Sequence, residues 1–120
     1  MKKIVIIEDD IVIRENLTEI LQLNNFEVLA IDNALEIQNI VEDFKPDILI
    51  TDIIMPDKDG IEIIIEIKKM YPEIALIAIS GGGRIDSESY LSTAKYLGAN
   101  ATLKKPFTHD QLINIIKTFE

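Results

Sequence analysis

A fivefold alternation between short apolar runs and segments with helical spacing is the feature that most constrains how this chain can fold. The runs are rich in β-branched residues, which favours strands, and the segments after them repeat apolar residues every three or four positions, which favours amphipathic helices. Because the runs stay apolar at consecutive positions, both faces of the sheet must be covered. The pattern predicts an α/β fold, a doubly wound five-stranded parallel sheet. The predicted strands are Lys3–Glu8, Phe26–Ile31, Asp47–Asp52, Ile74–Ser80 and Asn100–Lys105.

Residues that start and stop helices agree with this division. Pro46 and Pro72 are predicted to end the second and third helices, and Gly98 to follow the fourth as its C-cap. Thr108 and Gln111 are predicted to form a capping box for the fifth. The fourth helix, expected over Ile85–Leu97, has the weakest apolar stripe. The residues expected to face the core are Ile13, Leu17, Ile20 and Leu21, then Ile37, Ile40, Val41 and Phe44, then Ile61, Ile64 and Ile65, then Tyr90, Leu91, Ala94 and Leu97, and finally Leu112, Ile115, Ile116 and Phe119.

The bulk composition limits the class of protein. The 120 residues suit one domain over residues 1–120, with no room for an appended effector domain. With 12 basic and 21 acidic residues, the net charge of −9 repels nucleic acid and anionic membranes, so neither is an expected partner. The apolar run after the N-terminus is too short for a secretory signal, which predicts a cytoplasmic location. We expect a monomer or a weak dimer.

Polar side chains follow four of the predicted strands at the point where each strand ends. Glu8 and Asp9 close the first run, Asp52 the third, Ser80 the fourth and Lys105 the fifth. Ligands of an open parallel α/β sheet bind outside the carboxyl ends of the strands. These five side chains are therefore expected to share one edge of the sheet.

Carboxylates that meet at one edge raise one another's pKa unless a positive charge offsets them. Mg²⁺ prefers oxygen ligands, accepts one or two carboxylates and keeps positions open for phosphate oxygens. Lys105 adds a second positive charge and Ser80 a hydroxyl donor. The set suits phosphoryl transfer, in which the protein mainly positions groups and neutralises charge. Asp52 is the predicted acceptor, as an aspartyl phosphate.

Each of these residues also has a purely structural explanation when it is taken alone. The acids of Glu8–Asp10 would favour the start of a helix through capping and the helix dipole. Asp52 would begin a polar turn, Ser80 would be a loop residue and Lys105 a solvated lysine. His109, the single histidine, is most simply an exposed residue in the first turn of the last helix. The conjunction of the set favours the functional interpretation.

With these motifs in order, the chain resembles a response regulator receiver domain, the phospho-acceptor half of two-component signalling. The matching features are "IIEDD" with Arg14 in the next helix, "TDIIMPDKDG" around the acceptor, "AIS" at the fourth strand and "GANATLKKPF" at the fifth. The resemblance covers residues 1–120. It implies the flavodoxin-like strand order 2-1-3-4-5 of a (βα)5 fold.

The resemblance also implies roles for residues of the acidic edge. Asp52 would be phosphorylated, and Mg²⁺ would be bound by Asp9, Asp52 and the backbone carbonyl of Ile54. Glu8 would act on the metal mainly through water. Asp10 lies one position beyond the acidic pair of the family and is interpreted as the helix N-cap.

The remaining implied roles concern the phosphoryl group and its source. Ser80 and Lys105 would each contact a phosphoryl oxygen, and the bond between Lys105 and Pro106 would be cis. The donor would be a sensor histidine kinase or a histidine phosphotransfer protein, and output would pass to another protein. The domain would be no enzyme in the ordinary sense, since it catalyses only its own phosphorylation and dephosphorylation.

Three features depart from the family pattern. Thr102 stands where the family usually carries Tyr or Phe as a rotamer switch, three positions before the lysine. The segment between Ser80 and Gly98 is longer than usual and opens with "GGGR". Ile54, two positions after the acceptor, is apolar and cannot orient an attacking water, which predicts a long-lived phosphoryl group.

Three other functions compete with this interpretation. A flavin electron carrier of similar architecture needs hydroxyls and amides after the first strand, where three carboxylates stand. An aspartate-nucleophile phosphatase would want another acid at position 54. A pseudo-receiver, an interaction module that takes no phosphoryl group, is the main alternative because of Thr102, although the complete acidic set argues against it.

Overall fold

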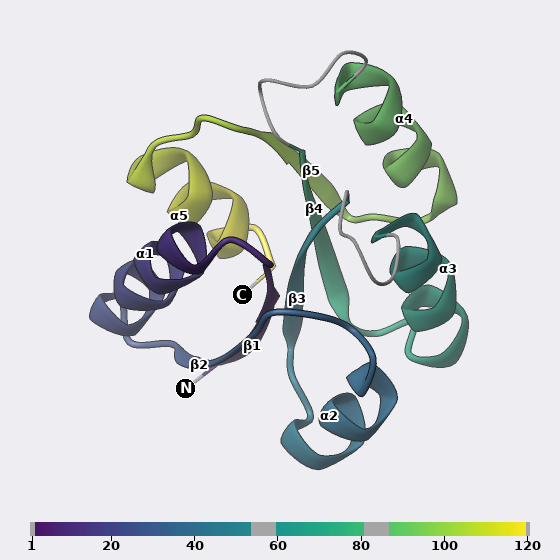
Figure 1. The fold of residues 1–120 in the computed structure, drawn as a ribbon, viewed down its shortest axis with the longest axis horizontal. Coiled ribbons are helices and arrows are strands. Elements are labelled where there is room, and N and C mark those ends of the chain that lie inside the picture. The colour runs from purple at the N-terminus through teal and green to yellow at the C-terminus, as the bar shows by residue number, and fades with distance from the viewer. Residues whose placement is uncertain (1, 54–59, 81–86, 120) are drawn as a thin grey trace.

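The computed structural model of the chain describes residues 2–53, 60–80 and 87–119, with the backbone alone for 87–91. Within these residues five strands alternate with five helices in the predicted order (Figure 1). The strands are β1 (Lys3–Ile7), β2 (Glu27–Ile31), β3 (Ile48–Asp52), β4 (Ala75–Ser80) and β5 (Ala101–Lys104). The helices are α1 (Ile11–Leu23), α2 (Ile37–Phe44), α3 (Gly60–Met70), α4 (Ser87–Leu97) and α5 (His109–Lys117).

The strands form one parallel sheet in the order β2-β1-β3-β4-β5, which confirms the predicted fold class. The chain moves outward from β1 to β2, then returns to the other side of β1 with β3. In an open α/β sheet such a reversal leaves a crevice at the carboxyl ends of the strands. In this sheet the reversal lies between β1 and β3, so the ends of these strands are the expected ligand position.

Helices cover both faces of the sheet, as the apolar runs require. Figure 1 shows α1 and α5 on one face and α2, α3 and α4 on the other. Successive residues of a strand point to opposite faces, so β1 sends Val5 and Ile7 into the core under α2 and α3. Ile4 and Ile6 enter the core under α1 and α5. The central strands are therefore buried on both sides.

Two helix starts are capped by the side chains that the sequence indicates. Asp10 precedes α1, and its Oδ1 accepts hydrogen bonds from the backbone N–H of Val12 at 2.9 Å and of Ile13 at 3.2 Å. Thr108 and Gln111 form the predicted capping box at the start of α5. These contacts satisfy N–H groups that have no partner inside the helix.

The helix ends also lie where the sequence predicts. α2 ends at Phe44, just before Pro46, and α3 ends at Met70, just before Pro72. Gly98 follows α4 with φ of 123°, a left-handed conformation that only glycine adopts without strain.

The prediction for the buried face of α3 is partly wrong. Ile65 was expected to face the core but is 47% exposed, whereas Ile63 and Ile67 are fully buried beside Ile64. Ile61 is half-buried against the core. Isoleucine occupies five of seven consecutive positions here, so periodicity could not identify the buried face. Contact with the sheet decides it.

The fourth helix is described over Ser87–Leu97. Its predicted start at Ile85 and the side chains of Tyr90 and Leu91 lie outside the described part of the chain. Ala94 is buried, as predicted, and packs in the core on the α3 side.

Within the described ranges, no helix has the length and apolar character needed to cross a membrane. The cytoplasmic location expected from the sequence stays a prediction.

Gly60 allows the start of α3 to lie directly against the end of β3, with no room for a side chain. Its N–H donates to the carbonyl of Ile53 at 2.7 Å. A Cβ at position 60 would lie 2.5 Å from Ile53 Cα and 2.8 Å from Ile53 O, and would also press on the carbonyl of Asp52. Although alanine favours helices more than glycine does, Gly60→Ala is expected to lower the free energy of unfolding by about 1–3 kcal/mol. Urea denaturation measures the change.

Lys69→Ala, at an exposed position of the same helix, is the matched control and is expected to leave stability nearly unchanged. A Gly60→Ala protein as stable as the wild type would contradict the prediction.

Candidate functional site

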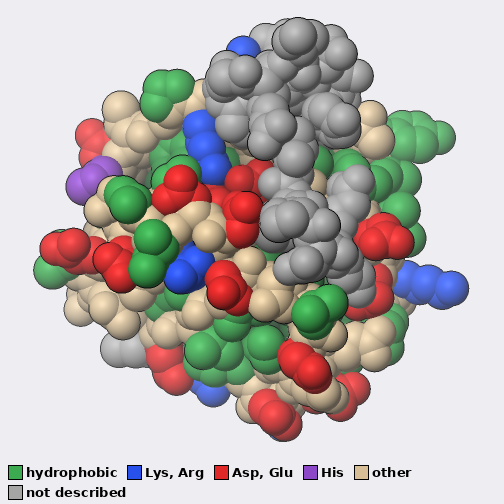
Figure 2. All heavy atoms as spheres, in the orientation of Figure 1, with side chains coloured by type: hydrophobic (Ala, Val, Ile, Leu, Met, Phe, Trp, Pro, Cys, Tyr) green, Lys and Arg blue, Asp and Glu red, His purple; other side chains and the backbone are tan. Residues whose placement is uncertain are grey.

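Residues from four strand ends lie at the carboxyl edge of the sheet. Glu8 and Asp9 follow β1, Asp52 ends β3, Ser80 ends β4 and Lys105 follows β5. The nearest carboxylate oxygens of Glu8, Asp9 and Asp52 all lie within 4.8 Å of one another. Figure 2 shows acidic side chains gathered next to basic ones on the face that Figure 1 views. The predicted convergence at one edge is therefore present.

Lys105 joins two of these carboxylates. Its Nζ lies 2.7 Å from Oε1 of Glu8 and 2.9 Å from Oδ2 of Asp52. Its backbone N–H donates to the carbonyl of Ser80 at 2.8 Å, which ties the end of β5 to the end of β4. The peptide bond between Lys105 and Pro106 is cis, as the resemblance implied.

The Glu8 carboxylate is held from both sides. Oε1 accepts from Lys105, and Oε2 accepts from the backbone N–H of Asp10 at 3.2 Å. Arg14, whose position in the sequence aligns the motif, donates from Nη1 to the carbonyl of Glu8 at 2.9 Å and to that of Asp9 at 3.5 Å. Its place one turn into α1 was the signal for this positioning role.

Ser80 and Asp52 are both shielded from water. Ser80 is fully buried, and its Oγ has no hydrogen-bond partner among the described residues. Asp52 is 8% exposed, and β3 and β4 pair with Asp52 opposite Ile79. A buried hydroxyl without a partner is uncommon, so Oγ of Ser80 is a polar group at this edge whose hydrogen-bonding capacity the described residues do not use.

Burial and neighbouring charges shift the pKa values of Glu8 and Lys105. Burial is the largest cause that raises the pKa of Glu8, and the negative charge of Asp52 raises it further. The hydrogen bond and charge of Lys105 only partly offset them, and the pKa of Glu8 is about 7 against an ordinary 4.5. For Lys105, burial lowers the pKa, but the hydrogen bonds and charges of Glu8 and Asp52 outweigh it and the net pKa is raised.

The remaining predicted residues lie where expected or outside the described part. Asp10 caps α1 and is no member of the carboxylate cluster. His109 is exposed, at the start of α5. Ile54, the predicted carbonyl ligand, lies outside the described residues.

The donor set fits a hard divalent cation. All three clustered side chains offer carboxylate oxygens, the ligand type that Mg²⁺ prefers. Asp9 is exposed while Glu8 and Asp52 are buried, so the cluster opens to solvent on the side of Asp9.

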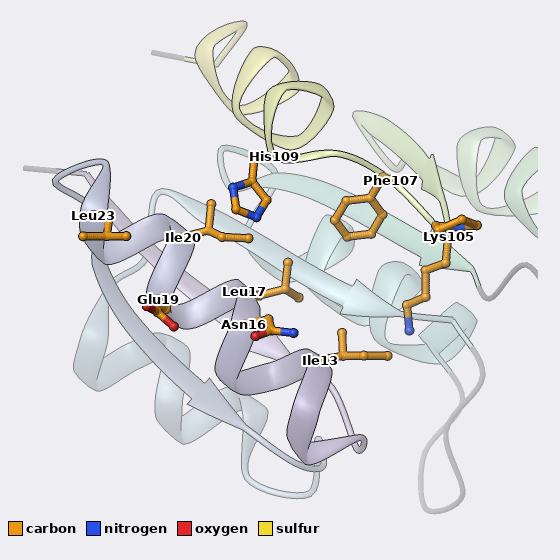
Figure 3. A pocket seen from close by; sticks show the side chains of 10 residues that line it. Ile13, Asn16, Leu17, Glu19, Ile20, Leu23, Lys105, Phe107 and His109 are labelled. Atoms are coloured by element: carbon orange, nitrogen blue, oxygen red, sulfur yellow. The ribbon is translucent and has the colours of Figure 1, made fainter.

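An apolar groove adjoins this site. It has a volume of about 560 Å³ and lies between α1 and the segment that joins β5 to α5 (Figure 3). Lys105 lines the groove and also contacts Asp52. Lys105 therefore belongs both to the lining of the groove and to the acidic edge. Its apolar lining residues are Ile13, Leu17, Ile20, Leu23, Pro106 and Phe107.

The response regulator receiver domain family matches residues 4–117 of the chain, which include every described residue of the acidic edge. This chain belongs to that family. The receiver is 36% identical over 118 residues to the transcriptional regulatory protein KdpE of Staphylococcus aureus, a match that covers 98% of this chain and 49% of that protein. It thus spans about half the length of this relative.

Other similar proteins are covered almost completely. Sporulation initiation phosphotransferase F of Bacillus subtilis is 30% identical over 118 residues, or 98% of this chain and 93% of that protein. The crystal structure of a response regulator receiver domain protein from Clostridium thermocellum superposes with a TM-score of 0.89 at 32% identity. That match covers 99% of the receiver and 94% of the other chain.

The raised pKa of Glu8 predicts a pH-dependent stability. Between the ordinary pKa of 4.5 and the folded value of about 7, the folded state holds a proton that the unfolded state releases. The stabilisation of the folded state by this proton is complete below pH 4.5 and is lost as the pH rises through about 7. Without divalent cations, the free energy of unfolding of Glu8→Gln relative to that of the wild type is therefore expected to increase by roughly 2–3 kcal/mol as the pH rises from about 5 to 8. Denaturant unfolding in EDTA at each pH measures the difference.

Glu27→Gln, at an exposed position on β2, should show no such trend and is the control. A difference between Glu8→Gln and the wild type that stays constant over this range would refute the prediction.

Proposed function

We propose that the receiver takes a phosphoryl group from a phosphohistidine donor onto Asp52 and passes the signal on through contact with another protein. The observation that carries the proposal is the place of Asp52. It ends the strand beside the crevice, its carboxylate meets those of Glu8 and Asp9, and Lys105 contacts it at 2.9 Å. A carboxylate so placed can reach both a metal ion and an incoming phosphorus atom.

Mg²⁺ is the proposed cofactor. Asp9 and Asp52 would bind it directly and Glu8 mainly through water, with the backbone carbonyl of Ile54 as a further ligand. When bound, the ion supplies positive charge to the oxygens of the transferring group. The clustered carboxylates support this assignment because their nearest oxygens lie within 4.8 Å of one another and are the ligand type that Mg²⁺ prefers.

The proposed transfer is one substitution at phosphorus. A carboxylate oxygen of Asp52 forms a bond to phosphorus while the bond from phosphorus to the donor's imidazole nitrogen breaks. The donor leaves as neutral imidazole after it gains a proton from solvent. Positioning and charge neutralisation supply most of the catalysis in such reactions.

Lys105 and Ser80 are proposed to stabilise the product. The Lys105 ammonium already touches the acceptor and would pair with an oxygen of the new phosphoryl group. The buried Oγ of Ser80 would donate to another oxygen, which would give this hydroxyl its partner. Catalysis would be limited to the domain's own phosphorylation and dephosphorylation, and the apolar Ile54 would leave the phosphoryl group long-lived.

A phosphorylation-independent pseudo-receiver is the second candidate. Thr102 favours it, because this half-buried residue of β5, opposite Ala78, replaces the family's usual aromatic switch. The two candidates differ in whether Asp52 ever carries phosphorus.

Intact mass after incubation with acetyl phosphate and Mg²⁺ separates them. The wild type is expected to gain the mass of one phosphoryl group, and EDTA or Asp52→Asn should abolish the gain because metal or acceptor is missing. Asp43→Asn makes the same chemical change at an exposed position on α2 and should be labelled like the wild type. An unchanged wild-type mass would favour the pseudo-receiver.

The groove beside Lys105 supports a protein as the phosphoryl donor. A donor protein must bring its phosphohistidine to Asp52 and needs a surface next to it. The groove offers an apolar stripe along α1 that ends at this site. A sensor histidine kinase or a histidine phosphotransfer protein that lays a helix there would satisfy both demands.

Leu23 tests this docking because it lines the groove and is 75% exposed. Leu23→Glu is expected to lower kcat/KM for transfer from a phosphohistidine protein about tenfold, equivalent to roughly 1.4 kcal/mol of lost contact. Labelling by acetyl phosphate should not change, because that small donor needs no groove. Met70→Glu, at an exposed apolar residue ending α3, is the control. Equal loss with both donors would argue against a docking role.

A further inference from the structure

Lys68, in the last turn of α3, makes a set of contacts that the phospho-acceptor site does not use. Its Nζ donates to the carbonyls of Pro72 at 3.3 Å and Ile74 at 3.0 Å, and to Oδ1 of Asn100 at 2.8 Å. The first two acceptors lie in the segment between α3 and β4. The third lies immediately before β5, 32 residues away in sequence. One ammonium therefore fastens three segments together.

Asn100 is the centre of this arrangement. Its Oδ1 accepts from the backbone N–H of Leu76 at 2.9 Å as well as from Lys68. Its own N–H donates to the carbonyl of Leu76 at 2.8 Å, and its carbonyl accepts from Nζ of Lys95 at 2.8 Å. Asn100 thus binds β4 through both its backbone and its side chain, and α4 through Lys95.

The chain passes closely over the stem of Lys68 where α4 ends. A Cβ at Gly98 would lie 3.1 Å from Cγ and 3.5 Å from Cβ of Lys68, and φ at Gly98 is already 123°. The next residue, Ala99, is buried and donates from N to the carbonyl of Ala94 at 3.0 Å. Small residues thus let the junction between α4 and β5 pack directly on α3.

Lys68 is drawn partly out of water by this packing. Burial lowers the pKa of Lys68, and the charge of Glu73 only partly opposes it. The ammonium is therefore satisfied mainly by neutral oxygens that its neighbours hold in place. Such an arrangement is costly to open, because opening leaves Nζ and the N–H of Leu76 without these acceptors.

The two ends of β4 have different attachments. Ser80, at the carboxyl end, belongs to the phospho-acceptor edge, whereas Leu76, near the other end, belongs to the contacts of Asn100. We propose that Lys68 and Asn100 make the junction between α4 and β5 a fixed point, so that a phosphoryl group on Asp52 leaves this end of α4 in place. Lys68 is then a positioning residue that keeps the conformational change caused by phosphorylation from reaching the end of α4 next to β5. The inference rests on the proposed phosphorylation of Asp52.

Amide hydrogen exchange, measured by NMR with and without Mg²⁺ and beryllofluoride as a phosphoryl mimic, tests the proposal. In the wild type, exchange at Leu76, Ala99 and Asn100 is expected to change less than about twofold on loading, while amides at Thr51 and Ser80 respond. In Lys68→Met, which keeps the stem and removes the donors, loading is expected to change exchange at the same three amides by about fivefold or more.

Two further variants sharpen the test. Lys69→Met, at the exposed neighbouring lysine, should behave like the wild type. Asn100→Asp keeps an acceptor for Lys68 and for Leu76 and should also behave like the wild type, whereas Asn100→Ala should resemble Lys68→Met.

The outcomes are distinguishable. A large loading effect at the junction of the wild type would overturn the proposal. Two results with Lys68→Met would also overturn it. In one, exchange at the junction is faster than in the wild type by the same factor in the loaded and the unloaded state, which marks a purely structural role. In the other, exchange at the junction is the same as in the wild type. No response at Thr51 and Ser80 in any variant would overturn the phosphorylation of Asp52, and this inference with it.

Discussion

Lys105 lies between the carboxylates of Glu8 and Asp52, and the acidic edge depends on that pairing. Two buried carboxylates a few ångströms apart resist joint ionisation, and one ammonium offsets part of the cost. Asp9 adds a third carboxylate on the solvent side, so the cluster carries more negative charge than Lys105 can neutralise. The residual charge makes the edge suited to a hard cation, and in the proposed function Lys105 would pair with the phosphoryl group on Asp52.

The sheet brings these groups together, and small backbone contacts hold them there. Arg14 fixes the carbonyl of Glu8 from α1, while Asp10 directs the chain into that helix. Gly60 allows α3 to begin directly against Ile53, next to Asp52. The site is therefore built on strand ends whose positions are set by hydrogen bonds, which is the precision that the proposed phosphoryl transfer would require.

The two faces of the sheet differ in what they offer. The face covered by α1 and α5 carries an apolar groove that reaches Lys105, where a donor protein is proposed to dock. On the other face, Lys68 and Asn100 fasten α3, α4, β4 and β5 at the far end of the sheet. In the proposed scheme the phosphoryl group arrives beside the groove, and the resulting conformational change does not extend to this junction.

The sequence by itself determined the strands, the helix caps and the edge at which Glu8, Asp9 and Asp52 meet, because local period and parallel pairing suffice for these. Its prediction of the buried face of α3 was partly wrong at Ile65, since isoleucines surround that helix and only contact with the sheet selects a side. The double contact of Lys105 and the contacts of Lys68 were decided by the tertiary structure alone. They join residues far apart in the chain, and their distances depend on how whole elements pack.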